Sequence, residues 1–168
     1  MADWGMRWFL TTVLTLLAAC TPSLRVEYTP IDFQTALAAV NQARAIARTC
    51  TNQGASTPYN AAPILHWNGL LGEVARQRAE YIQQTGQLSH QEGSSTSFAV
   101  AARSQQNGYS YLEIRENLAQ GANSAEDAVS AWLSSSTGHC DAIMAPHLTE
   151  MGLVKRGVYW VLVIAKPR

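Results

Sequence analysis

The pattern of apolar and polar positions separates a short hydrophobic N-terminal segment from a longer region of mixed helices and strands. Residues 8–19 carry no charge and follow a start whose only base is Arg7. A basic start followed by a short apolar stretch is the layout of an export signal. The stretch is too short for a membrane-spanning helix, which needs about 20 apolar residues.

The residues that end this segment predict a lipid anchor. They read Leu17-Ala18-Ala19-Cys20, and small residues before a cysteine suit the signal peptidase that processes lipoproteins. An ordinary signal peptide, or a buried N-terminal helix with an incidental cysteine, is the alternative. We expect residues 1–19 to be the signal peptide and Cys20 to carry the lipid. Thr21 after it, rather than Asp, favours the outer membrane of the cell envelope.

Removing this segment leaves 149 residues, which is a common size for one domain. Residues 20–31 contain two prolines and no apolar period, so they are expected to form a tether. The folded domain is expected over residues 32–168. It keeps a formal net charge of zero, which gives no electrostatic basis for binding nucleic acid.

Within the domain, apolar residues recur at helical spacing in four stretches and alternate in three others. Helices are expected over 32–48, 68–86 and 97–106, and after a capping box at Ser124 and Asp127. Strands are expected over 109–118, 151–154 and 158–165, the last two as a hairpin, and 51–60 is expected to be a loop. The pattern predicts an α+β fold, a small, mostly antiparallel sheet flanked by helices.

Two cysteines remain if Cys20 carries lipid. Cys50 and Cys140 would pair in an oxidising compartment, closing a loop of 90 residues. Chain-entropy arguments give such a bridge a stabilisation on the order of 4 kcal/mol. Two free or metal-binding thiols are the weaker alternative, because neither cysteine lies in a CxxC motif.

Candidate chemistry concentrates at His90, at Glu116 and at His147, each near an element boundary. Two imidazoles and a carboxylate that met in one cleft could bind a transition metal or move protons near neutral pH. Their spacing matches no local metal motif such as HExxH. Glu116 can instead be structural, with Arg115 as a surface pair. His139, beside the expected disulfide, is interpreted as structural.

Short segments across the chain together resemble the bacterial branch of the CAP superfamily (SCP-like proteins). This resemblance strengthens the prediction that His90, Glu116 and His147 share a cleft. This superfamily includes cysteine-rich secretory proteins, wasp antigen 5 and plant pathogenesis-related proteins. The matching segments are N-x-x-R at 41–44, A-P-I-L-x-W-N at 62–68, LSH at 88–90, EN at 116–117, GHC at 138–140 and TEMG at 149–152. They follow the family's order from about Phe33 to Ala165.

This resemblance implies a three-layer α-β-α sandwich and a Cys50–Cys140 disulfide. It also implies a cleft of two histidines and two glutamates that can hold a divalent metal such as zinc. His90, Glu116 and His147 match three of these positions. The second glutamate is missing, because Trp132 is followed by leucine and serines. A metal would then rest on His90 and His147 with water.

The family is better known for binding than for a shared reaction. We therefore expect a monomeric, non-catalytic module, anchored in the envelope through Cys20, that binds a lipid, sterol, other small hydrophobic molecule, glycan or protein partner. It would require no cofactor. The alternative is a metal-dependent peptidase or esterase that uses metal-bound water between His90 and His147, with Glu116 as base.

Overall fold

The computed structural model describes Met1 and residues 32–168. Residues 2–19 of the expected signal peptide, the lipid site at Cys20 and the whole tether lie outside this part. In chain order the elements are α1 (Phe33–Arg44), β1 (Arg48–Asn52), β2 (Ala55–Tyr59), β3 (His66–Trp67), α2 (Gly69–Thr85), α3 (Ala99–Gln106), β4 (Tyr111–Gln120), α4 (Ala125–Leu133), α5 (His139–Met144), β5 (Glu150–Arg156) and β6 (Tyr159–Pro167). Within the described residues, no helix has the length and apolar character needed to cross a membrane.

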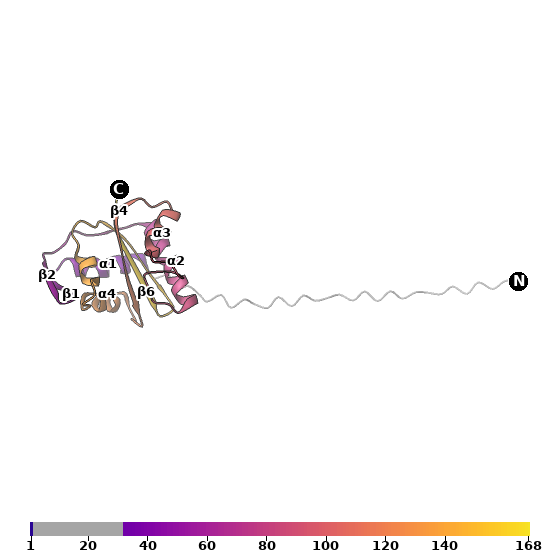
Figure 1. The fold of residues 1–168 in the computed structure, drawn as a ribbon, viewed down its shortest axis with the longest axis horizontal. Helices are drawn as coiled ribbons and strands as arrows, with labels where there is room; N and C mark the ends of the chain where they lie inside the picture. Colours follow the sequence, from indigo (N-terminus) through magenta and orange to yellow (C-terminus); the bar gives the residue numbers. More distant parts are fainter. Residues whose placement is uncertain (2–31) are drawn as a thin grey trace.

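A four-stranded sheet in the order β3-β5-β6-β4 forms the middle layer. Only β3 and β5 run parallel, and the other neighbours are antiparallel. Helices α2 and α3 cover one face, while α1, α4, α5 and the β1–β2 hairpin lie on the other (Figure 1). The predicted three-layer sandwich is confirmed. Strand β4 is an edge of this sheet, so one of its sides pairs with no strand of the sheet. The candidate site described below lies beside this edge.

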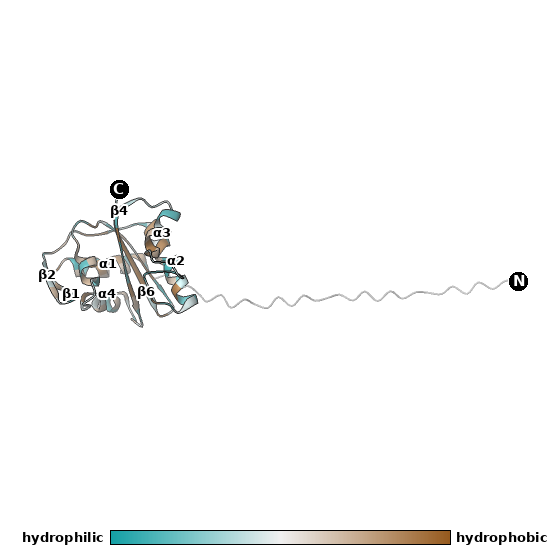
Figure 2. Cartoon of the chain, viewed as in Figure 1, coloured by the Kyte–Doolittle hydropathy of each residue, from teal (hydrophilic) through white to brown (hydrophobic). Residues whose placement is uncertain are grey.

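Two apolar cores, one on each face of the sheet, hold the layers together. The strands between them are among the hydrophobic segments in Figure 2. Trp132 and Trp160 are buried as expected, with 1% of each exposed, whereas Trp67 is half-buried. At Gly152 the sheet lies directly against α2, since a Cβ there would stand 2.3 Å from the backbone nitrogen of Gly72. Only glycine permits this approach.

Local sequence signals explain where the helices begin and end. The Asn68 side chain accepts hydrogen bonds from Leu70 and Leu71, and α2 stops at Gly86 in the left-handed conformation with φ of 70°. Ser124 and Asp127 form the expected capping box of α4. These boundaries are confirmed.

Two local predictions are wrong. The first helix ends at Arg44 instead of residue 48, and residues 51–60, expected to be a loop, form most of the β1–β2 hairpin. Strand β2 is exposed except for half-buried Tyr59, so it lacks the alternation of apolar residues that marks a strand. The hairpin is fixed instead by the Cys50–Cys140 disulfide, whose Cα atoms lie 5.5 Å apart. The predicted pairing of these cysteines is confirmed.

Candidate functional site

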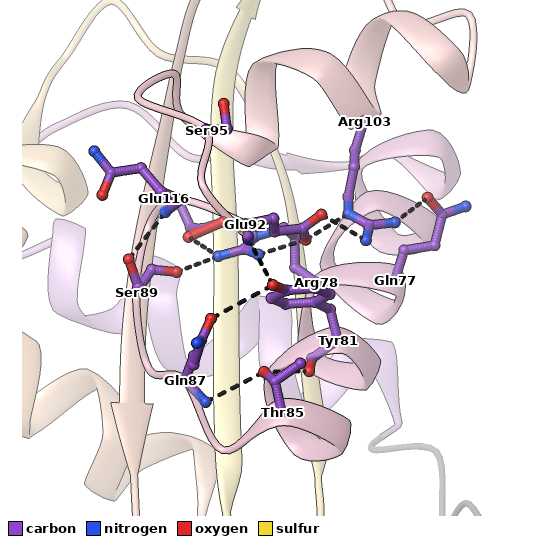
Figure 3. A network of polar contacts seen from close by, with 12 residues as sticks. Gln77, Arg78, Tyr81, Thr85, Gln87, Ser89, Glu92, Ser95, Arg103 and Glu116 are labelled. Atoms are coloured by element: carbon purple, nitrogen blue, oxygen red, sulfur yellow. Dashed lines mark hydrogen bonds and ion pairs between the residues drawn. The ribbon is translucent and has the colours of Figure 1, made fainter.

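A buried ionic network lies between α2 and the edge strand β4. Arg78 belongs to the inner face of α2, and its side chain is fully buried. Its Nε donates to Glu116 Oε2 at 2.7 Å, and its Nη2 donates to Glu116 Oε1 at 3.2 Å and to the Ser89 carbonyl. A third donor, Nη1, reaches Glu92 (Figure 3). One guanidinium therefore joins the helix, the strand and the 89–92 loop.

Pairing of opposite charges sets the direction of the pKa shifts of Arg78 and Glu92. Burial alone lowers the pKa of Arg78, but the hydrogen bonds and charges of Glu116 and Glu92 outweigh it, so the net pKa is raised. Burial raises the pKa of Glu92, yet hydrogen bonds from Arg103 and Arg78 bring it below its ordinary value. Arg103 makes two bonds of 2.8 Å to Glu92. The loop is held by ion pairs that form only with ionised carboxylates.

His90 is attached to the same carboxylate. Its Nδ1 lies 3.1 Å from Glu116 Oε1, and an ionised carboxylate can only accept, so Nδ1 carries the proton. The Nε2 atom of a neutral ring is then an acceptor. Among the hydrogen bonds of residues 32–168, none uses this atom. His90 is 40% exposed in its side chain, whereas Glu116 is 2% exposed, so the imidazole is the part of the pair that a ligand can reach.

Beside His90 lies a small pocket of about 170 Å³. Its walls are His90, Phe98, Val100, Ile114, Arg115 and Glu116. Phe98 is 61% exposed, and its ring lies 5.9 Å from the His90 ring in an edge arrangement. An exposed aromatic ring beside an imidazole and two aliphatic side chains makes a site that is apolar except at one end.

The structure does not bring His147 to the same carboxylate. Its Nε2 lies 2.8 Å from Glu113 Oε2, and Arg115 bonds to the other oxygen of Glu113 at 2.6 Å. Glu113 and Glu116 are three positions apart on β4, with no register shift between them. Alternating side chains of a strand point to opposite faces, so the two histidines attach to opposite faces of the sheet edge.

His139 is the first residue of α5, which packs on the same face of the sheet as Glu113. Its carbonyl accepts from the Asn117 side chain at 3.0 Å, and its Nδ1 lies 3.0 Å from Ser135 Oγ. Burial lowers the pKa of His139, and nearby His90 lowers it further when the His90 ring is protonated. His90 and His139 are therefore close enough for their charges to interact. Glu116 holds the His90 ring, and the Asn117 side chain holds the His139 carbonyl. The predicted structural role of His139 agrees with these contacts.

The donors around His90 do not fit a metal centre with three protein ligands. Within residues 32–168 no three His, Cys, Asp or Glu side chains converge for a metal ion. His90 Nδ1 and both oxygens of Glu116 already have protein partners. A cation shared by His90 and His147 stays a prediction, and the function proposed below does not use one.

Sequence analysis missed Arg78 as the partner of Glu116, and it missed Glu92, Arg103 and Phe98. The expected partner, Arg115, bonds to Glu113 instead. A signal for Arg78 is present, because it occupies an inner position of α2. The buried positions of this helix are Leu71, Val74, Ala75, Arg78, Ala79 and Ile82. A charged residue within such an apolar stripe requires buried partners, either a counter-charge or a set of hydrogen-bond acceptors.

Comparisons with known proteins agree with this architecture. Residues 37–156 match the model of the CAP family, described as the cysteine-rich secretory protein family. No curated protein matches the chain.

Three solved bacterial structures are similar. An extracellular protein with an SCP domain from Bacillus anthracis str. Ames matches with a TM-score of 0.57 and 21% identity, over 62% of this chain and 34% of that chain. A cysteine-rich secretory protein from Staphylococcus aureus subsp. aureus Mu50 gives 0.56 and 13% identity, over 80% of this chain and 39% of that chain. An outer surface protein from Borrelia burgdorferi gives 0.61 and 18%, over 84% of this chain and 99% of that chain.

The present chain thus spans about a third of the first of these proteins and 39% of the second. At these identities the likeness shows the fold alone. The first of these proteins is described as extracellular and the third as an outer surface protein.

Proposed function

Because the chain belongs to the CAP family of cysteine-rich secretory proteins, we propose that it is an envelope protein that binds a small amphipathic molecule without transforming it. The binding site is the pocket between His90, Phe98 and Ile114. A neutral His90 offers an acceptor atom at one end, Phe98, Val100 and Ile114 supply the apolar wall, and Arg115 and Glu116 complete the lining. The ligand class that fits is a small hydrocarbon with one hydroxyl group.

The state of Glu116 carries this proposal. Its carboxylate accepts hydrogen bonds from Arg78 on both oxygens and from His90 on one. A general base must reach the proton that it removes. Both oxygens of Glu116 already accept hydrogen bonds from protein groups, and its side chain is only 2% exposed, so the carboxylate is poorly placed to reach a substrate proton. Glu116 instead orients His90, as a carboxylate often does for a ligand-contacting imidazole.

A binding titration with 1-hexanol tests the pocket. Nuclear magnetic resonance should show saturable shifts at His90 and Ile114 with a Kd of about 1 mM, equivalent to about 4 kcal/mol. The isomeric ether 1-methoxypentane, which has no hydroxyl donor, should bind more weakly. Phe98→Ala should weaken hexanol binding, whereas Leu112→Ala should not, because Leu112 is 58% exposed and lies outside this pocket.

Two results would contradict the proposal. Equal binding of the alcohol and the ether would remove the role of His90, and absence of saturable binding would remove the pocket. The hydrolase alternative makes a separate prediction: turnover of a peptide or ester panel that disappears in Glu116→Ala. Such turnover would replace the binding function with a catalytic one.

We also propose that a lipid on Cys20 holds the protein to a membrane, in the outer membrane where the cell has one. The motif at residues 17–20 supports this. A Cys20→Ser variant should move from the membrane fraction to the soluble fraction. Retention of the variant on the membrane would contradict the anchor.

A further inference from the structure

Exposed apolar side chains gather along one side of the domain, away from the pocket. Phe33, Ile46, Ile64 and Leu70 are 47%, 62%, 61% and 44% exposed. They belong to α1, the turn after it, and the segment that leads through β3 into α2. We call this surface the α1–β3 face. The other large exposed apolar residues include Phe98, in the wall of the pocket, and Leu112, on β4 outside the pocket.

Hydrogen bonds show that the α1–β3 face is continuous. The Asn41 side chain donates to the Leu65 carbonyl at 3.0 Å and accepts from the Leu65 amide at 2.8 Å. Arg44 Nε donates to the Pro63 carbonyl at 2.7 Å. At the other end of α1, the Phe33 ring lies 5.6 Å from the ring of Trp67. Residues 62–67 therefore run antiparallel along α1.

This face carries almost no charge. Residues 33–47 and 61–72 contain a single Asp, Glu, Lys or Arg, the fully buried Arg44, while exposed Asp32 and half-buried Arg48 border the first range. The exposed side of α2 is different, because Glu73, Arg76 and Glu80 form ion pairs there. A water-soluble surface normally intersperses charges among its apolar groups. An uncharged apolar face of this kind marks an interaction surface.

The position of the chain identifies the surface that covers it. Helix α1 begins at Phe33, and residues 20–31 separate it from the proposed lipid site at Cys20. Twelve residues span at most about 40 Å. The α1–β3 face is thus the part of the domain joined most closely to the bilayer. We propose that this face rests on the membrane interface, an inference that depends on the proposed lipid anchor.

The chemistry of the face suits a lipid interface. Aliphatic side chains and an aromatic ring can enter the region between headgroups and acyl chains, and a half-buried Trp67 matches the preference of indole for that depth. Few side chains take part, so the contact is weak by itself. The tether compensates, because it converts docking into an intramolecular step at high effective concentration. The pocket at His90 then faces away from α1, across the sheet edge.

Fluorescence quenching of the lipidated full-length protein tests this orientation. An environment-sensitive dye is attached to one of three variants, Ile64→Cys, Leu70→Cys or Leu112→Cys. Each labelled protein is bound to vesicles of phosphatidylethanolamine and phosphatidylglycerol that contain a nitroxide-labelled lipid as quencher. Labelling is selective, since Cys50 and Cys140 form a disulfide. The Ile64 and Leu70 sites should lose most of their emission to the lipid quencher. The control site, equally exposed at Leu112, should keep it.

Each other outcome overturns the inference. Equal emission at all three sites, in protein bound to the vesicles, shows an anchored domain that does not dock. A blue-shifted but unquenched label with a doubled particle mass shows a second copy on the face. If the protein carries no lipid and stays in solution, the anchor itself is absent. Mass spectrometry of Cys20 distinguishes this result from the first two.

Discussion

Two buried arginines hold the two faces of the sheet, and their partners differ. Arg44 and Arg78 are both fully buried, and each lies on the inner side of its helix. Within residues 32–168, Arg44 donates only to backbone carbonyls, those of Pro63, Ile143, Ala145 and Leu148. Arg78 donates to the carboxylates of Glu116 and Glu92 and to one carbonyl.

The difference is that Arg44 has partners that do not titrate, whereas Arg78 has partners that do. Carbonyl groups do not titrate, and burial without a counter-charge lowers the pKa of Arg44 to about 10. Arg44 therefore joins α1 to the end of α5 throughout the physiological pH range. Two partners of Arg78 are titratable carboxylates, and one of these, Glu116, lines the pocket beside His90. This arginine positions His90 through Glu116 and the 89–92 loop through Glu92.

The largest effect is expected from Arg78→Met. It leaves the carboxylate of Glu116 buried without its cation, which typically costs about 3–5 kcal/mol of unfolding free energy. Chemical denaturation measures this loss. The double variant Arg78→Met/Glu116→Gln should recover part of it because it removes the orphaned charge. A double variant no more stable than Arg78→Met would show that the pair is not coupled.

Arg44→Met is expected to cost about 2–4 kcal/mol, because several buried carbonyls lose their donor. Its cost should not change with pH between 5 and 8, since none of its partners titrates. The same denaturation series, repeated at several pH values, checks this. A cost that grew as carboxylates ionised would place an acidic partner near Arg44.

Acidification should weaken the Arg78 network specifically. The folded-state pKa of Glu92 is lowered, so its contribution is present above the unfolded pKa and is lost as pH falls through the folded value. Unfolding free energy should therefore decline more steeply with acid in the wild type than in Glu92→Gln. Parallel pH profiles for the two proteins would contradict this role of Glu92.

The smallest effect is expected from Arg103→Met. Arg103 and Glu92 are 21% and 22% exposed in their side chains, and ion pairs open to solvent contribute about 1 kcal/mol or less. Thermal unfolding should show a small decrease in Tm. A loss as large as that of Arg78→Met would mean that the outer pair, not the buried one, holds the loop.

The sequence predicts the fold well where local chemistry decides it. Asn68 and Gly86 bound α2, and the Ser124 capping box starts α4, because caps act over a few residues. The Cys50–Cys140 pair is predicted by the assignment of Cys20 to a lipid and by the family resemblance, and the structure contains this disulfide. The β1–β2 hairpin escapes prediction because its exposed strand is fixed by a distant disulfide and not by its own pattern.

The site is predicted only in part. His90 and Glu116 meet as expected, at 3.1 Å. His147 was expected in the same cleft, but it bonds to Glu113, since alternation along β4 turns positions 113 and 116 to opposite faces. The partner of Glu116 comes from α2, and long-range pairing of this kind leaves no spacing in the sequence. Arg78 is detectable only as a charge within an apolar stripe.

The nitrogen chemical shifts of the His90 ring test the central claim, that Glu116 is held by Arg78 and orients His90 toward the pocket. The account predicts that neutral His90 carries its proton on Nδ1, and that Glu116→Gln releases this preference without unfolding the domain. A wild-type ring protonated mainly on Nε2 would contradict the account, because Nδ1 would then have no proton to donate to Glu116, and the acceptor proposed for the ligand would be absent.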